Sequence, residues 1–172
     1  MNAKLTLLFS RRSVREFSEG DVPPAAVHDM LEAAMAAPSA CCKDPWEFIV
    51  VRSAAQRGRI AQGLPNGGFL TKASVGIVVC GSLARAHSGE LSYMLQDCSA
   101  AMQNLLVAAQ GLGYGACWLG VHPRADRIAL LRNLLALPET VIPIGVAAIG
   151  LPAVKLEART RYNAAFVHQE TW

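Results

Sequence analysis

The segment 97–120 constrains the fold of this chain more than any other part of the sequence. Its only formal charge is Asp97. Around and within it, apolar side chains recur at three- and four-residue spacing, the period of a helix that packs on a core: Met94, Leu95, Cys98, Ala101, Met102, Leu105, Ala108, Ala109 and Leu112. Gly111 and Gly113 are typical of a helix C-terminus, and the run 116–119 suits a short strand. We therefore predict a long buried helix that leads directly into a buried strand.

The rest of the chain alternates between helix and strand patterns. Apolar periodicity predicts helices at 5–10, 24–38, 54–63 and 126–137. Apolar runs predict further strands at 46–51, 75–80 and 141–151. This alternation indicates an α/β or α+β layered domain, and it leaves a parallel sheet and a mixed or antiparallel sheet equally open. Because the chain has 172 residues and no evident linker or repeat, we expect residues 1–172 to form a single domain.

The chain carries few charges for its size. Charged residues make up 17% of it, against roughly 25% in typical soluble domains, so we expect another subunit to cover part of the surface. The net charge of +3 comes without basic runs interleaved with aromatics, which argues against a nucleic-acid partner. The longest apolar run, 141–151, is shorter than the roughly 18 residues that cross a bilayer. We therefore expect an obligate oligomer with a small anionic ligand, and neither nucleic acid nor membrane as a partner.

The cysteines predict neither a disulfide framework nor a metal site. They number five, and Cys80, Cys98 and Cys117 lie in apolar segments where a free thiol behaves as a small hydrophobic group. Cys41 and Cys42 are adjacent, which is the spacing neither of a zinc site nor of a redox pair. A reactive role for this pair is the less favoured alternative. The cysteine pattern indicates a reducing, cytoplasmic compartment.

Arginines gather near both ends of the chain, and few acid or base groups accompany them. The run 11–15 holds three arginines and a serine, which suits either a phosphate or carboxylate site or a solvated turn. No histidine is grouped with a nucleophile, and no P-loop is present. The pattern Gly111-x-Gly113-x-x-Ala116 follows a helix and precedes a strand, the reverse of a dinucleotide-binding fingerprint. We therefore expect a bound cofactor to carry the chemistry.

Five sequence blocks that span nearly the whole chain together resemble the FMN-dependent nitroreductase family. They are Arg11-Arg12-Ser13-Val14-Arg15, Ala37-Pro38-Ser39-Ala40 with Pro45-Trp46-Glu47-Phe48, Asp97 through Asn104-Leu105, Gly111-Leu112-Gly113 with Cys117-Trp118-Leu119-Gly120, and Arg159-Thr160-Arg161-Tyr162. The resemblance implies an α+β fold with α/β/α layers, in which helices flank a mixed, mainly antiparallel sheet. It also implies a homodimer with flavin sites at the subunit interface and a C-terminal extension that crosses to the partner.

The resemblance assigns cofactor-binding roles but no catalytic side chain. The family's binding site for the flavin phosphate, ribityl chain and pyrimidine edge corresponds in this sequence to Arg11, Arg12, Ser13 and Arg15. The basic pair that completes the phosphate pocket is matched by Arg159 and Arg161. The loop that reaches the flavin from the other subunit is matched by Pro38, Ser39, Ala40 and Cys42, and a pyrimidine contact by Asn66. The strand end against the isoalloxazine ring is matched by Trp118, Leu119 and Gly120, with the Gly120 N–H directed at N5.

The activity implied by the resemblance has two half-reactions. NAD(P)H gives hydride to the N5 atom of FMN, and a nitroaromatic, quinone or similar small acceptor is then reduced. Cys42 and Asp44 depart from the asparagine and glutamine that the family commonly has there, so an amide donor near the flavin is lost. Two alternatives stay open: a flavin-binding protein with little turnover, and a narrower FMN-dependent reductase of activated alkenes.

Three residues near these blocks have structural interpretations. Trp46 is expected to anchor its strand in the core. Asp97 is expected to make a structural hydrogen bond or ion pair, and not to act as an acid catalyst. Trp118 suits a core contact and a ligand contact equally.

Overall fold

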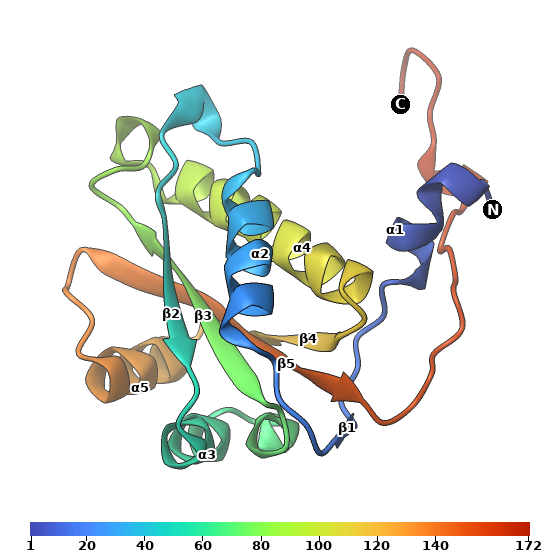
Figure 1. The fold of residues 1–172 in the computed structure, drawn as a ribbon. Coiled ribbons are helices and arrows are strands. Elements are labelled where there is room, and N and C mark those ends of the chain that lie inside the picture. Colours follow the sequence, from blue (N-terminus) through green and yellow to red (C-terminus); the bar gives the residue numbers. More distant parts are fainter.

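The computed structural model describes all 172 residues and has three layers, with a sheet between two pairs of helices (Figure 1). The strands are β1 (Phe17–Ser18), β2 (Trp46–Val51), β3 (Val75–Ser82), β4 (Gly115–Gly120) and β5 (Val141–Pro152). The helices are α1 (Thr6–Ser10), α2 (Pro24–Met35), α3 (Ala54–Gly63), α4 (Leu91–Gly111) and α5 (Ala125–Leu135). Short 3-10 turns lie at Ala3–Leu5, Ala40–Cys42, Gly68–Thr71, His87–Gly89 and Ala164–Phe166. The predicted helices and strands are therefore confirmed, with shifts of a few residues at their ends.

The sheet is built around β5, which pairs with three other strands. β5 is antiparallel to β1, β3 and β4, and β2 completes the sheet as the antiparallel neighbour of β3. The one parallel contact is an isolated bridge between Ser13 and Ala116. The sheet orientation that the sequence left open is thus antiparallel, and the expected α+β layering is confirmed.

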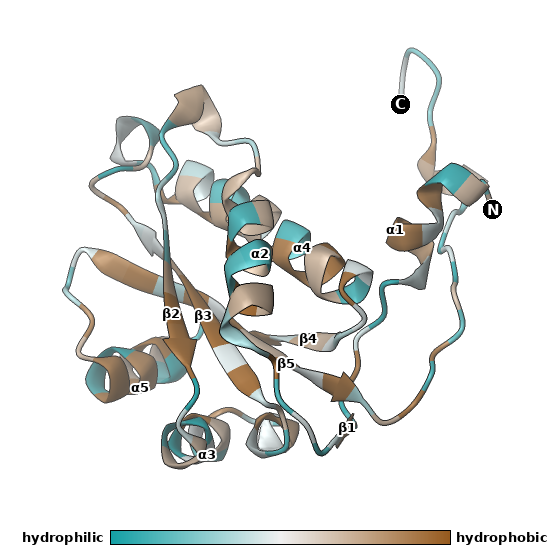
Figure 2. Cartoon of the chain, viewed as in Figure 1, coloured by the Kyte–Doolittle hydropathy of each residue, from teal (hydrophilic) through white to brown (hydrophobic).

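Two apolar cores lie on the two faces of the sheet. α2 and α4 cover one face, where Met30, Met94 and Leu105 are fully buried, and α3 and α5 cover the other. Neighbouring residues of β5 alternate between the two cores, as side chains of a strand must: Ala147 joins the first and Val146 the second. The apolar strands β2, β3 and β5 stand out in brown in Figure 2. Trp46 is buried in the first core, which confirms its predicted anchoring role.

The long helix α4 is buried along one side only. Asp97 and most of the apolar residues that follow the helical period are buried, whereas Tyr93, Gln96 and Gln103 are exposed. Of the periodic residues, Leu95 and Ala108 are half-buried, and Leu112 just beyond the helix is exposed. The helix ends at Gly111, and Gly113 beyond it has a φ of +85°, which glycine adopts without steric cost. No helix of the structure is long and apolar enough to span a membrane.

The two ends of the chain form an arm that projects from the layered body (Figure 1). The Arg159 N–H donates to the Phe9 carbonyl at 3.1 Å, and the Arg12 guanidinium donates to the Glu157 carbonyl. No residue beyond Pro152 is buried, and Trp172 is 100% exposed. The tail aromatics, which would favour burial, are therefore exposed within one chain, because the end of the tail turns outward along the N-terminal helix.

Candidate functional site

The arginine segment 11–15 lies along the outer edge of β4. The Val14 N–H donates to the Ala116 carbonyl at 2.9 Å, and Ser13 forms the parallel bridge to the same residue. This places the segment in an extended conformation, in which successive side chains point to opposite sides. Val14 is buried and Ser13 is exposed, as this alternation requires. The three arginines therefore cannot all face one ligand.

Arg11 and Arg15 share one side of the segment. Burial raises the pKa of the Cys117 thiol in β4, and the positive charges of Arg15 and Arg11 oppose this rise. Arg15 also lies over the ring of Phe69, with its guanidinium carbon 6.0 Å from the ring centroid. Phe69 belongs to the turn that follows the exposed Asn66, so the structure brings the region of Asn66 to the Arg15 side.

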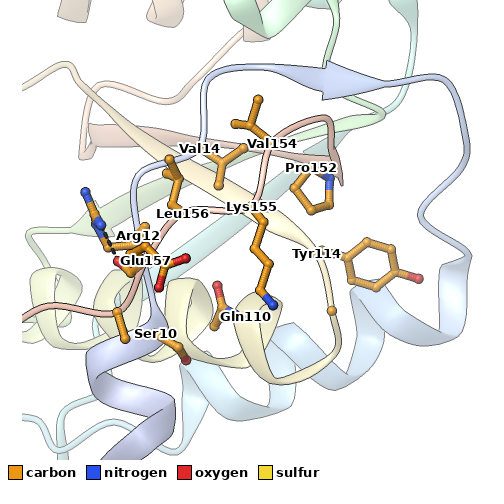
Figure 3. Close-up of a pocket in the computed structure, with 13 residues that line it drawn as sticks. Ser10, Arg12, Val14, Gln110, Tyr114, Pro152, Val154, Lys155, Leu156 and Glu157 are labelled. Carbon is orange, nitrogen blue, oxygen red and sulfur yellow. Dashed lines mark hydrogen bonds between the residues drawn. The ribbon is translucent and has the colours of Figure 1, made fainter. Parts of the chain in front are cut away.

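Arg12 points to the other side, into a hollow of about 340 Å³ between α1, the end of α4 and the tail. Figure 3 shows its guanidinium bonded to Glu157, with the Lys155 side chain directed toward Gln110. Arg11, Ser13 and Arg15 do not line this hollow. The structure thus separates Arg12 from the arginines with which the sequence groups it.

The end of β4 presents one open glycine beside two packed side chains. Leu119 is buried in the core beneath α3 and α5, and Trp118 packs against the opposite core. The indole of Trp118 lies over β5, since a Cβ built at Gly145 would come within 2.1 Å of its Nε1 atom. A Cβ at Gly120 would meet no atom within 4 Å, and the Arg127 guanidinium donates to the Gly120 carbonyl at 2.8 Å. Only Gly120 and the outer part of Trp118 are accessible to a ligand at this strand end.

The loop 38–44 lies at the other end of the molecule, over the start of α4. The Ala40 N–H donates to Oδ1 of Asp97 at 3.0 Å, so the predicted structural role of Asp97 is confirmed. Ser39 Oγ accepts the Asp44 N–H at 3.0 Å and donates to the Asp44 carboxylate. Cys41 and Cys42 are exposed on the turn between these anchors.

One chain therefore carries two separate groups of predicted site residues. The loop 38–44 is fixed at Asp97, whereas α1 packs at the far end of α4, where Leu7 lies beside Gly111. Gln110, which lines the hollow beside Arg12, lies thirteen positions after Asp97 in the helix. This corresponds to about 20 Å along the helix axis. Arg159 joins the arginine group through Phe9, and Arg161 lies exposed two residues further along the tail. The two groups cannot contact one small ligand from the same chain.

The arginine group fits the cofactor that the sequence predicts. A phosphate needs forked cationic donors, which Arg11 and Arg15 provide on one side of the segment and Arg159 provides nearby. A flat ring needs close backbone approach, which the open space at Gly120 allows. The residues present are therefore compatible with FMN.

Only two of the five cysteines are expected to react in the folded protein. Cys41 and Cys42 are exposed, whereas burial raises the pKa of the Cys80 and Cys98 thiols to about 12. At pH 8 only about one in ten thousand of such thiols would be the reactive thiolate. Ellman's reagent should therefore titrate two thiols rapidly and all five after denaturation. The double variant Cys41→Ser/Cys42→Ser should lose the rapid phase, and a third rapid thiol in the folded protein would contradict this picture.

Three contacts of the site were missed from the sequence. They are Phe69 beneath Arg15, Arg127 on the Gly120 carbonyl, and the link from Asp97 to Ala40. The isolated charge of Asp97 in an apolar helix was a usable signal that it has a polar partner. The other two contacts carried no sequence signal, because they depend on how α5 and the turn Gly68–Thr71 pack against β4 and the arginine segment.

Comparison with known proteins agrees with the fold. The Nitroreductase family profile matches residues 8–64 and 61–151. A candidate NADH dehydrogenase/NAD(P)H nitroreductase of Archaeoglobus fulgidus is 38% identical over 175 residues that cover all of both chains. A candidate nitroreductase of Desulfovibrio desulfuricans, solved in complex with FMN, has a TM-score of 0.85 at 30% identity, covering 100% of this chain and 99% of that one. An FMN-dependent nitroreductase of Clostridium difficile has a TM-score of 0.90 at 25% identity, covering 98% and 99%.

The fold, with the arginine segment beside β4 and the open backbone at Gly120, is that of a flavin-type α+β protein. This chain belongs to the nitroreductase family.

Proposed function

We propose that this protein is an FMN-dependent NAD(P)H oxidoreductase that acts as a homodimer on nitroaromatics, quinones or similar small acceptors. The observation that carries the proposal is the separation of the predicted site residues into two groups at opposite ends of α4, within a chain of the nitroreductase family. A second copy that reverses the direction of α4 would bring the loop 38–44 of one chain to the arginine segment of the other. Each site would then be complete only in the dimer.

The arginine group would hold the phosphate end of FMN. Arg11 and Arg15 supply forked charges beside β4, Ser13 supplies an exposed hydroxyl between them, and Arg159 and Arg161 supply two further cations from the tail. Arg12 has a different part in this proposal, because its guanidinium ties the tail to the segment through the Glu157 carbonyl. The tail would thereby be positioned to extend over a second copy.

The open end of β4 would orient the ring of FMN. Gly120 leaves the backbone accessible, Arg127 fixes the Gly120 carbonyl, and Trp118 and Leu119 hold the strand in the two cores. The loop of the second copy, with Pro38, Ser39, Ala40 and Cys42, would close the opposite side and exclude water. FMN itself, when bound, supplies the hydride and electron transfer between NAD(P)H and the acceptor. The chain contributes binding, orientation and positive charge.

The exposed apolar surface of the arm supports the homodimer. Leu5, Leu7 and Leu8 on the N-terminal part are exposed together with Phe166, Val167 and Trp172 on the tail. Such apolar surface is unfavourable in water, and a partner subunit would bury it. The whole of residues 1–172 would act as one flavin-binding unit. All five cysteines are free, which is compatible with the reducing cytoplasm that we propose as its location.

The visible absorption spectrum of the purified protein tests this function. We expect two flavin bands, release of FMN on denaturation, and oxidation of NADH or NADPH that accelerates when a quinone or nitroaromatic is added. A colourless protein that takes up no added FMN would contradict the proposal. Bound FMN with negligible turnover would instead support the alternative of a flavin-binding protein. The reason to consider this alternative is that Cys42 replaces the asparagine that the family commonly has there.

A further inference from the structure

Asp97 is buried in α4 with only part of its hydrogen-bonding capacity used. Asp97 is 5% exposed. Oδ1 accepts the Ala40 N–H at 3.0 Å, from a residue 57 positions away, and Oδ2 is buried without a partner. Asp97 also lines a shallow hollow of about 320 Å³ between the loop residues 38–40 and Tyr93, Gln96 and Ala100 of α4.

Fold stability alone does not account for a carboxyl group at this position. Burying a polar group costs free energy unless its hydrogen bonds are replaced, and one of the two oxygens here has no replacement. The surrounding positions of α4 are filled by Cys98, Ala101 and Met94, which are apolar and buried. An apolar residue at position 97 would suit this packing as well or better. The carboxyl group therefore does something other than fill the core.

The loop that Asp97 contacts has an unusual backbone. Cys41, Cys42 and Asp44 have φ values of 50°, 51° and 47°, in the left-handed region that residues with a side chain rarely adopt. Three such residues within four positions, with only Lys43 among them in a right-handed conformation, persist only where the surroundings hold them. Two side-chain hydrogen bonds stabilise the loop. Asp97 accepts the Ala40 N–H before the left-handed residues, and Ser39 accepts the Asp44 N–H where the loop closes. Of these, only the first connects the loop to the body of the protein through a side chain.

We propose that Asp97 is a positioning residue that holds the loop 38–44 in its left-handed shape, in which Ser39, Ala40 and Cys42 can meet the flavin of a second copy. This inference rests on the proposed function for its consequence, but its first step concerns one chain only. The carboxyl group touches neither cofactor nor substrate in this proposal. It acts through the Ala40 amide, which Oδ1 accepts, while Oδ2 stays buried and unpaired.

Two variants separate this role from a purely structural one. Asp97→Leu removes the acceptor for the Ala40 N–H, and Asp97→Asn keeps a side-chain oxygen that can accept it. Asn104→Leu is the matched control, because Asn104 donates from the same helix to the Ala33 carbonyl at 3.0 Å and has no contact with the loop. Amide hydrogen exchange across residues 38–44, measured without flavin, reports on the loop. FMN affinity and the melting temperature are measured on the same proteins.

We expect loop exchange to quicken by about fivefold to tenfold in Asp97→Leu, the change that corresponds to loss of one typical hydrogen bond. Asp97→Asn and Asn104→Leu should exchange in this loop as the unchanged protein does. The FMN dissociation constant should rise about tenfold in Asp97→Leu only, while its melting temperature stays within about 5 °C of the starting value.

Unchanged loop exchange in Asp97→Leu would overturn the inference, and so would a faster loop that leaves FMN affinity unaltered. A loss of melting temperature with faster exchange throughout the protein would also overturn it, because this would mean a structural role. If the unchanged protein binds no FMN, the proposed function fails, and the exchange data still decide whether Asp97 holds the loop.

Discussion

Deletion of residues 158–172 should convert the protein from a dimer to a monomer and weaken FMN binding by about a hundredfold or more. The deleted segment carries Arg159 and Arg161, and a hydrogen bond to a charged group is worth roughly 1.5–3 kcal/mol, so the loss of two such contacts corresponds to at least about two factors of ten. It also carries the exposed Tyr162, Phe166 and Trp172, which in our proposal lie on the second copy. The layered body should remain folded, because no residue beyond Pro152 is buried.

Light scattering after size-exclusion chromatography measures the mass, circular dichroism the fold, and fluorescence titration the FMN affinity. The control is the full-length double variant Arg159→Gln/Arg161→Gln, which removes the charges but keeps the aromatics. It should weaken FMN binding and stay dimeric. A truncated protein that is still dimeric and binds FMN normally would show that the arm serves neither purpose.

Most of the fold could be predicted because each element carries its own local signal. The apolar period of α4, the glycines after it and the apolar run of β5 depend on residues close together in the sequence. The order and direction of the strands could not be predicted from them. The pairing of β5 with β1, β3 and β4 joins segments that are far apart in the chain, and no local pattern encodes which neighbours meet.

The sequence suggests a set of candidate site residues, but it does not suggest their arrangement. Alternation along the extended segment 11–15 was a local rule that could have separated Arg12 from Arg11 and Arg15. It was not applicable until the Val14 hydrogen bond to Ala116 established the segment as extended. The left-handed residues Cys41 and Cys42 gave no signal either, since neither is a glycine and both depend on anchors elsewhere in the chain.

The outward course of the tail is the feature that the contacts within one chain explain least. Its aromatics predict burial, yet Tyr162 and Phe166 are 75% and 79% exposed. Apolar residues at this density are typical of segments that another surface covers. In our proposal that surface belongs to a second copy, so the arm and the two halves of the site would be completed by the same assembly.

The arginines at 12 and 15 should respond differently to the same substitution. Arg15→Gln should raise the FMN dissociation constant by about tenfold or more, since it removes a charge-assisted contact on the side shared with Arg11. Arg12→Gln should change the constant by less than about threefold, because the Arg12 guanidinium is directed to the Glu157 carbonyl and not toward Arg15. Both substitutions remove one positive charge, so the two variants lose the same general electrostatic attraction for the phosphate.

Titration of FMN at two salt concentrations tests this difference. The effect of Arg15→Gln should shrink at high salt to the extent that its charge is solvent-exposed, and the difference between the two variants should persist. Arg12→Gln should instead loosen the tail, which faster amide exchange over residues 155–161 would report. Equal losses of FMN affinity would mean that the phosphate lies between the two sides of the segment, and the alternation along 11–15 would then not determine which arginines bind it.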